Sequence, residues 1–433
     1  MRRFLLIWTG QFISILGSGL TSFGLAVFVF ERTGQATAFA VYALLDSLPR
    51  ILLAPAAGVL IDRWSRRWVM AAADTGNALV TLAAAALYLT GRLDVGAVYL
   101  IVLAGSICSA FQEPAYSAAI PQLVPSAQLV RANSLVQFSQ STALLAAPLL
   151  AGWLFGQIGL GGLMLIDFAT YFFAVGALLA VAIPQPQAEP RGAQRRSLWA
   201  EAGLGWPYLL ARPGLLHLIG YFAGVNLLLN GVLVLTGPLV LSFADATALG
   251  LVYSIAGVGT LLGSFLLSVW GGPRRRVAGI LGGVALSALG LLVVGLRPAL
   301  PSVGAGYFIL LFAVPMGSSL VLALFQSKVE PAMLGRVLAL RTMLGRSTMP
   351  VGYLLGGWLA DYVFEPAMRV GGALAGGPAG AVLGVGRGRG LGLMFALAGL
   401  GVLVLTLAAA ADPRLRHVER DVPDAAPEPA AAG

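Results

Sequence analysis

The sequence predicts an all-α membrane protein with twelve transmembrane helices in two pseudo-symmetric six-helix halves. The 433 residues are 58% hydrophobic and only 10% charged, with a mean hydropathy of +0.87. Soluble proteins are about 45–50% apolar, so this chain lacks the polar residues for a water-facing surface. A helix needs about 20 apolar residues to cross a bilayer. Twelve runs are long enough: 4–30, 38–61, 67–90, 95–114, 132–156, 160–183, 214–241, 247–270, 277–296, 303–325, 341–364 and 390–411.

The distribution of cations predicts the orientation of these helices. An even number of spans places both termini on one side, and most of the 27 Lys and Arg residues fall in loops or tails on that side. Because cation-rich loops stay in the cytoplasm, we expect both termini to be cytoplasmic in a multi-pass protein of the cell (inner) membrane. The net charge of +9 then reflects topology in the lipid bilayer, and we expect no nucleic-acid partner.

An internal repeat divides the chain into two halves. The segment LLAGWL at 149–154 recurs as LLGGWL at 354–359, and the same offset relates Arg131 to Arg336. Parallel six-helix halves are an architecture that transporters use. We expect the following organisation: an N-terminal half at 1–183, a cytoplasmic linker at 184–212, a C-terminal half at 213–411 and a cytoplasmic tail at 412–433.

The residue types that support enzyme chemistry are scarce. Cys108 is the single cysteine, and His217 and His417 are the two histidines, so the sequence offers neither a disulfide framework nor a clustered metal site. No phosphate-binding P-loop occurs, so ATP cannot drive this protein directly. We therefore expect a protein that is not an enzyme and that carries no cofactor and no metal.

The stretch GVLIDRWSRR at 58–67 concentrates charge in one short turn between two apolar runs. It resembles the loop signature of the major facilitator superfamily, and the opening segment and residues 113–135 resemble its branch of macrolide efflux and enterobactin exporters. The resemblance implies a cytoplasmic gating motif, in which Asp62 meets the amino end of the eleventh helix when that side is closed. The alternative is that the arginines only fix topology. The motif falls on Gly58, Asp62, Arg63, Arg66 and Arg67.

Ionisable residues inside spans are expensive unless they are paired or face water, so each is a functional candidate. Asp46 and Arg50 stand four residues apart in the second span and share one helix face. They are candidates for coupling proton binding to substrate movement, or else for a fixed ion pair. Glu113 is expected to be a partner of Arg66 or Arg67 in the gating motif. Asp74 is expected to snorkel or to join that network.

Neutral polar residues recur at helical spacing in two spans. The resemblance implies that helices 1, 4, 7 and 10 line a central cavity, and interhelical hydrogen bonding is the alternative. The cavity candidates are Gln11, Ser14, Ser18, Thr21, Asn226 and Asn230. Asp167, in the sixth span, is expected to make a structural hydrogen bond. Pro148 and Pro350 are expected to bend their helices.

These features favour a secondary active transporter, expected as a monomer, that moves a small-molecule substrate by alternating access. The leading hypothesis is proton-coupled export of an amphiphilic peptide natural product, siderophore or macrolide. The alternatives are an uptake symporter or a lysolipid flippase of the same fold. A more remote alternative is a membrane scaffold of a biosynthetic complex.

Overall fold

The computed structural model describes residues 1–181, 206–273 and 275–423, and within them the regular structure is helical. The side chains of Pro55, Val59, Asp62, Arg63, Pro331 and Ala332 also lie outside the description. The chain forms two compact units. The first holds Met1–Gly192 and Val240–Ser254, and the second holds Ala193–Leu239 and Ile255–Gly433. Most of the predicted linker at 184–212 lies outside the described residues, so its role stays a prediction.

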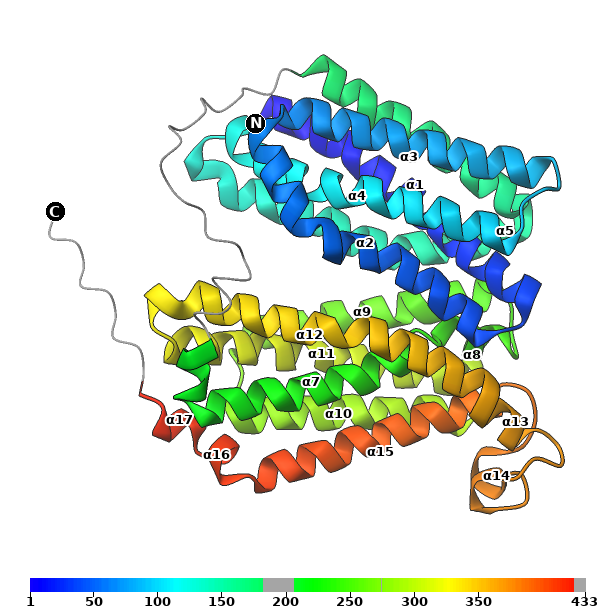
Figure 1. The fold of residues 1–433 in the computed structure, drawn as a ribbon, viewed down its shortest axis with the longest axis vertical. Helices are drawn as coiled ribbons and strands as arrows, with labels where there is room; N and C mark the ends of the chain where they lie inside the picture. Colours follow the sequence, from blue (N-terminus) through cyan, green and yellow to red (C-terminus); the bar gives the residue numbers. More distant parts are fainter. Residues whose placement is uncertain (182–205, 274, 424–433) are drawn as a thin grey trace, which may run out of the picture. The chain divides into compact units, whose positions relative to one another are not determined.

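The first unit is a bundle of long helices (Figure 1). Its elements are α1 (Arg2–Thr33), α2 (Ala36–Arg63), α3 (Arg66–Leu89), α4 (Val95–Leu123), the short 3-10 helix η1 (Ser126–Gln128) and α5 (Leu129–Ala180). Tight breaks separate them. Gly34 ends α1 in the left-handed conformation, with φ 64°. Asp94 begins α4, where its side chain accepts a 2.7 Å hydrogen bond from the Ala97 amide.

Helix α5 consists of two arms that meet at Gly159. The backbone there has φ 65° and ψ −177°, which only glycine adopts readily, and the helix is broken. Both arms pack on the beginning of α1. The Trp8 indole donates to the Leu135 carbonyl of the first arm at 2.9 Å, and Gly10 packs against the Phe173 backbone of the second. The first arm therefore begins beside the start of α1 and the second arm ends beside it, so α5 supplies two of the predicted spans.

The second unit is also helical. Its elements are α7 (Pro213–Leu233), α8 (Thr236–Leu241), α9 (Ala246–Trp270), α10 (Arg276–Leu296), α11 (Leu300–Lys328), α12 (Pro331–Leu359), the π-helix η2 (Ala360–Phe364), α13 (Glu365–Met368), α14 (Pro378–Leu383), α15 (Arg389–Ala411), α16 (Pro413–Arg416) and α17 (Val418–Asp421). The last residues of α8, from Val240 on, and the first residues of α9, up to Ser254, fall in the first unit. The loop after the eleventh span carries the small helices α13 and α14.

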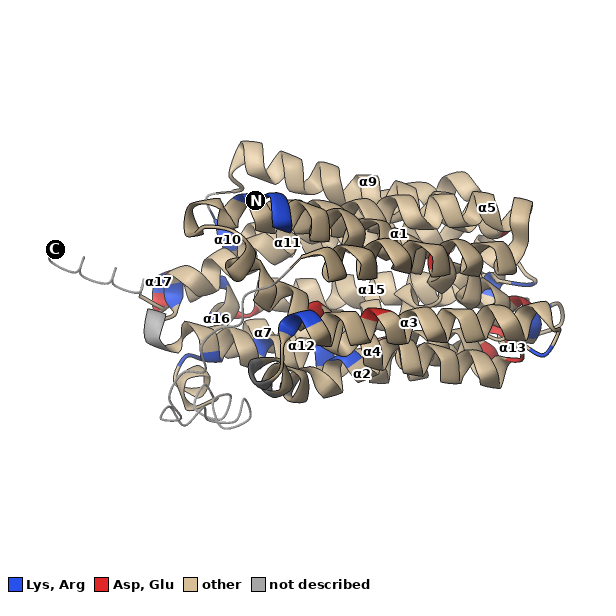
Figure 2. Cartoon of the chain, turned by 90° about the horizontal axis from the view of Figure 1, so that it is seen from above, with Lys and Arg blue, Asp and Glu red and all other residues tan. Residues whose placement is uncertain are grey.

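Ten helical segments of the described residues are long and apolar enough to cross a membrane. The two arms of α5 count once among them, and α12 is not among them although it is long enough. With α5 taken as two spans and α12 added, the described helices match the twelve predicted. Charged residues colour only short stretches of the ribbon in Figure 2. The polarity of α12, which carries Arg336, Arg341 and Arg346, becomes important below.

Two helices extend beyond the predicted spans. The fourth helix does not end near Pro114 but continues through it and through Pro121 to Leu123. Helix α12 starts at Pro331, ahead of the predicted span at 341–364. A proline removes one backbone hydrogen bond without forbidding the helix, since neighbouring helices support a membrane helix from outside.

Glycines bring α12 and α7 into backbone contact. Gly352 packs against Asn230 and Gly231, and Gly356 lies directly on the Gly231 carbonyl with no room for a Cβ atom. Small residues allow this approach because membrane helices associate through close packing rather than through the hydrophobic effect. The contact fixes the register between α7 and α12, which positions the polar residues that both helices carry.

Candidate transport cavity

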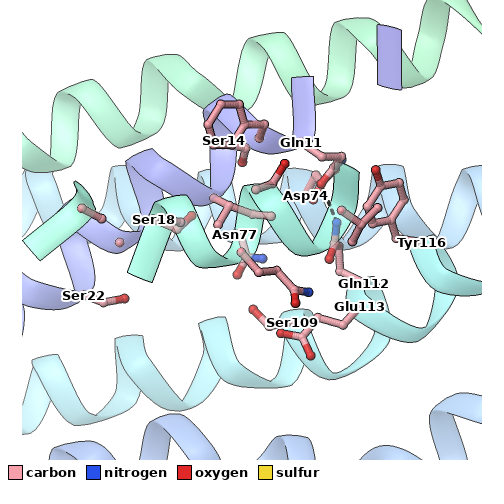
Figure 3. A pocket seen from close by; sticks show the side chains of 18 of the residues that line it. Gln11, Ser14, Ser18, Ser22, Asp74, Asn77, Ser109, Gln112, Glu113 and Tyr116 are labelled. Atoms are coloured by element: carbon pink, nitrogen blue, oxygen red, sulfur yellow. Dashed lines mark hydrogen bonds between the residues drawn. The ribbon is translucent and has the colours of Figure 1, made fainter. Parts of the chain in front are cut away.

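A cavity of about 840 Å³ opens inside the first unit, between α1, α2, α3, α4 and α5 (Figure 3). Its wall is unusually polar for this chain. The polar and charged lining residues are Gln11, Ser14, Ser18, Ser22, Asp46, Arg50, Asp74, Asn77, Ser109, Gln112, Glu113, Ser117, Ser139 and Gln140. Trp8 and Phe12 line the same space and stack on each other with ring centroids 5.7 Å apart. The cavity therefore offers both hydrogen-bonding groups and a flat apolar surface.

Arg50 holds two carboxylates together on the cavity wall. Its Nη2 atom lies 2.5 Å from Asp46 Oδ2, as their spacing predicted, and its Nη1 atom lies 3.6 Å from Glu113 Oε1. The Ser106 hydroxyl donates to the Asp46 carbonyl at 2.5 Å, which ties α2 to α4. The Arg50 and Asp46 side chains are 35% and 40% exposed and that of Glu113 is 62% exposed, so water reaches all three.

The expected partner of Glu113 was wrong. The ion pair that the structure gives Glu113 is with Arg50, because α4 continues past this residue as a helix and keeps it facing α2. Arg66 instead donates to the Ala118 carbonyl at 2.7 Å. Arg67 donates to the carbonyl of Leu178 at 2.8 Å.

A chain of side-chain hydrogen bonds leads from the cavity to a buried acid. Gln112 donates to Gln11 Oε1 at 2.6 Å, and Gln11 donates to Asp74 Oδ2 at 2.8 Å. Asp74 is only 3% exposed, so the expectation that it snorkels to the surface was wrong. Its neighbour is a glutamine of α1 rather than an arginine of the gating motif. Figure 3 shows these side chains converging from α1, α3 and α4.

The other cavity candidates on α1 divide between the cavity wall and the protein interior. Ser14 and Ser18 line the cavity, whereas Thr21 is buried and is not among the lining residues. Ser18 donates to Asp167 Oδ1 at 3.3 Å, and Thr81 donates to Asp167 Oδ2 at 3.2 Å. These bonds give Asp167 the structural hydrogen bonding that the sequence predicted.

The second unit has a smaller polar pocket of about 340 Å³ between α7 and α12. Asn226 and Asn230 of α7 line it, as do Arg341, Thr342 and Arg346 of α12. Gly345 lines the same pocket, and the side-chain amide of Asn226 packs beside it. Sequence reasoning placed Arg341 in the cation count of a cytoplasmic loop and Arg346 inside a span. It gave neither residue a role.

Comparison with known proteins identifies this architecture. The sequence profile described as Major Facilitator Superfamily matches residues 7–353. The chain belongs to the major facilitator superfamily. It is therefore a multi-pass membrane transporter of small molecules and not an enzyme, as the resemblance implied.

Two relatives are named as drug exporters. The macrolide efflux protein A of Streptococcus pyogenes is 29% identical over 378 residues, which cover 83% of this chain and 90% of the relative. The multidrug efflux pump Tap of Mycolicibacterium fortuitum is 27% identical over 367 residues, covering 80% and 86%. Both alignments extend over most of each protein.

Solved structures share the fold at low identity. The nucleoside transporter NupG has a TM-score of 0.67 at 18% identity, covering 94% of this chain and 99% of that protein. A bacterial homologue of the human lysosomal transporter Spinster, in an inward-facing unoccupied conformation, has a TM-score of 0.60 at 14% identity, covering 96% and 95%. These matches support the superfamily fold.

The superfamily's loop motif lies between α2 and α3. The side chains of Asp62 and Arg63 lie outside the description, so the contacts expected of them stay predictions. Gly58 is exposed, and a Cβ atom there would meet nothing within 4 Å. Arg67 donates to two carbonyls near the end of α5, where unpaired carbonyls and the negative end of the helix dipole attract a cation. The basic pair thus anchors the turn within its own unit.

The two predicted bend sites lie inside continuous helices. Pro148 is within α5 and lines the cavity, and its carbonyl touches Gly250 of α9. Pro350 is within α12. The sharp break in α5 comes at Gly159 rather than at Pro148. Bending at the two prolines stays a prediction.

Proposed function

We propose that this protein exports an amphiphilic small molecule in exchange for protons. The substrate class is a peptide natural product, a siderophore or a macrolide, and the movement is alternating access. The relatives that are named for macrolide and multidrug efflux support export, because the alignments extend over most of both chains. The protein would act as a monomer in the inner membrane with both termini in the cytoplasm.

The observation that carries the coupling is the arrangement of Asp46, Arg50 and Glu113 on the cavity wall. One guanidinium stands between two carboxylates that water reaches. When one carboxylate is protonated, the attraction that holds Arg50 on that side is lost, and the other carboxylate keeps it. Proton binding to one carboxylate would thereby shift the Arg50 guanidinium toward the other carboxylate, inside the cavity that holds the substrate. A substrate that binds Arg50 would in turn release a carboxylate to accept a proton.

Gln112, Gln11 and Asp74 form a separate hydrogen-bonded chain on the wall of the same cavity. Asp74 is a second acid of this cavity that could bind a proton. Sequence reasoning named Gln11 for the cavity but gave Gln112 no role. The stacked rings of Trp8 and Phe12 would hold the apolar part of an amphiphile beside these polar groups.

The gating motif completes the proposal. Asp62 would close the cytoplasmic side by meeting the amino end of α12, the eleventh span, in one conformation only. Gly58 would allow that approach, because it is exposed and carries no side chain. The predicted halves at 1–183 and 213–411 would move against each other, with 184–212 as the linker and 412–433 as a cytoplasmic tail.

The test is accumulation of a probe in proteoliposomes with an imposed pH gradient. Erythromycin and dansyl-trileucine serve as the probes. We expect transport from the cytoplasmic face against its gradient when the opposite side is acidic. Asp46→Asn and Glu113→Gln should lose this accumulation, whereas Asp94→Asn should keep it, because Asn also caps a helix.

Other outcomes would contradict the proposal in distinct ways. Movement of probe in the same direction as protons would indicate an uptake symporter. Movement of a fluorescent lysolipid, with neither probe transported, would indicate a flippase. Gradient-driven export by Asp46→Asn and by Glu113→Gln at the parent rate would make the ion pair a structural contact.

A further inference from the structure

The pocket between α7 and α12 carries two positive charges that nothing in the described residues neutralises. Arg341 and Arg346 line it, and neither has an ion pair or a hydrogen bond in the described part of the chain. The contact found for Arg341 is with the ring of Phe325, whose centroid is 5.8 Å away. A cation–π contact of this kind leaves the N–H donors of the guanidinium free.

Three acids of the second unit are engaged elsewhere. Glu330 pairs with Arg212 at 3.1 Å, and Asp412 contacts His217 at 2.6 Å. Glu365 accepts from two backbone amides at the start of α15. None of these carboxylates lines the pocket. No carboxylate among the described lining residues therefore balances the positive charge of the pocket.

The position of the pocket residues along their helices adds to this observation. Arg346 lies one residue past the midpoint of α12, and Asn226 lies in the second half of α7. At 1.5 Å per residue, Arg346 is about 22 Å along the helix from Pro331. An arginine within a membrane span costs several kcal/mol unless it faces water or a partner, so Arg346, inside the predicted span at 341–364, is a functional candidate. Topology alone would be served by arginines at the helix end.

The surrounding groups suit an anion. Asn226 and Asn230 stand four residues apart on one face of α7, and each offers amide donors. The backbone contact of Gly352 and Gly356 with α7 holds these amides opposite the arginines. Thr342 donates its hydroxyl proton to the Leu338 carbonyl at 2.8 Å, so this proton is not offered to a ligand. Guanidinium and amide donors line the same pocket of about 340 Å³.

We propose that this pocket is an oxyanion-binding subsite, which takes the carboxylate or phosphate of an anionic or zwitterionic amphiphile. The inference rests on the proposed function for its role in transport and names the substrate class more closely. The oxyanion belongs to the transported molecule or to a lipid headgroup. Arginine binds carboxylate and phosphate oxygens in a bidentate manner, and asparagine amides orient them.

The test is a binding measurement without any gradient, on the full chain in nanodiscs of phosphatidylcholine. The probes are dansyl-trileucine with a free carboxylate and the same peptide with a carboxyl-terminal amide. We expect the free acid to bind about tenfold more tightly or better, which is the size of one charge-assisted hydrogen bond. Arg341→Gln and Arg346→Gln should each reduce this preference. Arg336→Gln, on the same helix but outside the pocket, should leave it unchanged.

Two further comparisons identify the source of the oxyanion and control for misfolding of the variants. Arg341→Lys and Arg346→Lys keep the charge, so they should keep part of the preference and show that the site is folded. Nanodiscs with phosphatidylglycerol should weaken acid binding in the parent, but not in the Gln variants, if a lipid phosphate occupies the pocket. If phosphatidylglycerol has no such effect, the oxyanion belongs to the transported molecule.

Equal affinity of the parent for acid and amide, with no phosphatidylglycerol effect, would overturn the proposal. A preference that survives in both Gln variants would do the same. Because no pH gradient is used, a failure of proton-coupled export would not alter this result. The two proposals therefore fail separately.

Discussion

The two halves of the chain each hold a polar site, and the two sites differ in charge. The first-unit cavity contains Asp46 and Glu113 around a single arginine, with the buried Asp74 beyond them. The second-unit pocket contains Arg341 and Arg346 and no acid. Both sites are lined by long helices of the same superfamily architecture. The difference must therefore come from side chains placed on a shared scaffold.

The internal repeat shows where the halves diverge. The offset that aligns residues 149–154 with 354–359 places Arg341 opposite Val136 and Arg346 opposite Ser141. Val136 lines the first-unit cavity, so the corresponding wall exists in both halves. The arginines are thus not required by the repeated fold. Their position fits the proposed binding of an anion in the second half.

The largest effect should come from breaking the contact that builds the second pocket. Gly356→Val places a side chain on the Gly231 carbonyl, where the helix backbones touch. Overpacking of this kind should reduce stability by about 3 kcal/mol or more. The measurement is the thermal melting of purified protein in detergent. Gly335→Val, at an open position of α12, should melt as the parent does, and equal melting of both variants would contradict the packing account.

The next effect concerns the shared cation of the first cavity. Arg50→Gln leaves Asp46 and Glu113 without their common partner, so the initial rate of gradient-driven export should fall about a hundredfold. A double-mutant cycle with Asp46→Asn measures whether the residues act as a unit. We expect the double variant to be little worse than either single variant. Strictly additive losses in log rate would show that the two residues act independently.

A smaller effect should follow from breaking the hydrogen-bonded chain. Gln11→Leu removes the donor to Asp74 and leaves a carboxylate that is 3% exposed without that bond. The expected loss of stability is about 1–3 kcal/mol, because a buried polar group then lacks its partner. Denaturant or thermal unfolding measures it. Ser14→Ala, one turn along α1, is the control, and a comparable loss in that variant would argue against a special role for Gln11.

The smallest effect lies outside the membrane, at the end of α15. The hydrogen bond from His217 holds the pKa of Asp412 below its ordinary value of 3.8. A carboxyl whose pKa is lowered by folding stabilises the folded state above its unfolded pKa, and this contribution disappears as the pH falls through the lowered value. Asp412→Asn should therefore lower the melting temperature at pH 7 by an amount equivalent to less than about 1 kcal/mol. A difference between variant and parent that stays constant from pH 7 to pH 3 would contradict this assignment.

Much of the fold could be predicted from the sequence, because hydrophobic length and cation placement are local properties. The pair of Asp46 and Arg50 could also be predicted, since both lie on one helix at a spacing that fixes their distance. The partner of Glu113 could not, because it depends on the register between α2 and α4. The prediction also stopped α4 at Pro114, where the helix in fact continues.

The second site shows a different reason for failure. Sequence reasoning found Asn226 and Asn230 by their spacing, but it treated Arg341 as a topology signal. An arginine is recognised as uncompensated only when the positions of all nearby acids are known. Gln112 was missed for a related reason, since a neutral residue beside Glu113 gives no signal until its partner Gln11 is located. The contact between Gly345 and the Asn226 amide likewise follows from helix packing.

The most direct test of the account is to follow proton movement while the probe is transported. In inside-out membrane vesicles with an acidic interior, an acridine dye reports protons that leave as dansyl-trileucine enters. Proton-coupled export through Asp46 and Arg50 predicts probe-dependent proton release in the parent and none in Asp46→Asn or Arg50→Gln. Arg341→Gln should need more probe for the same release while keeping the number of protons per probe. Probe entry without proton release in the parent, or protons moving in the same direction as the probe, would contradict the account.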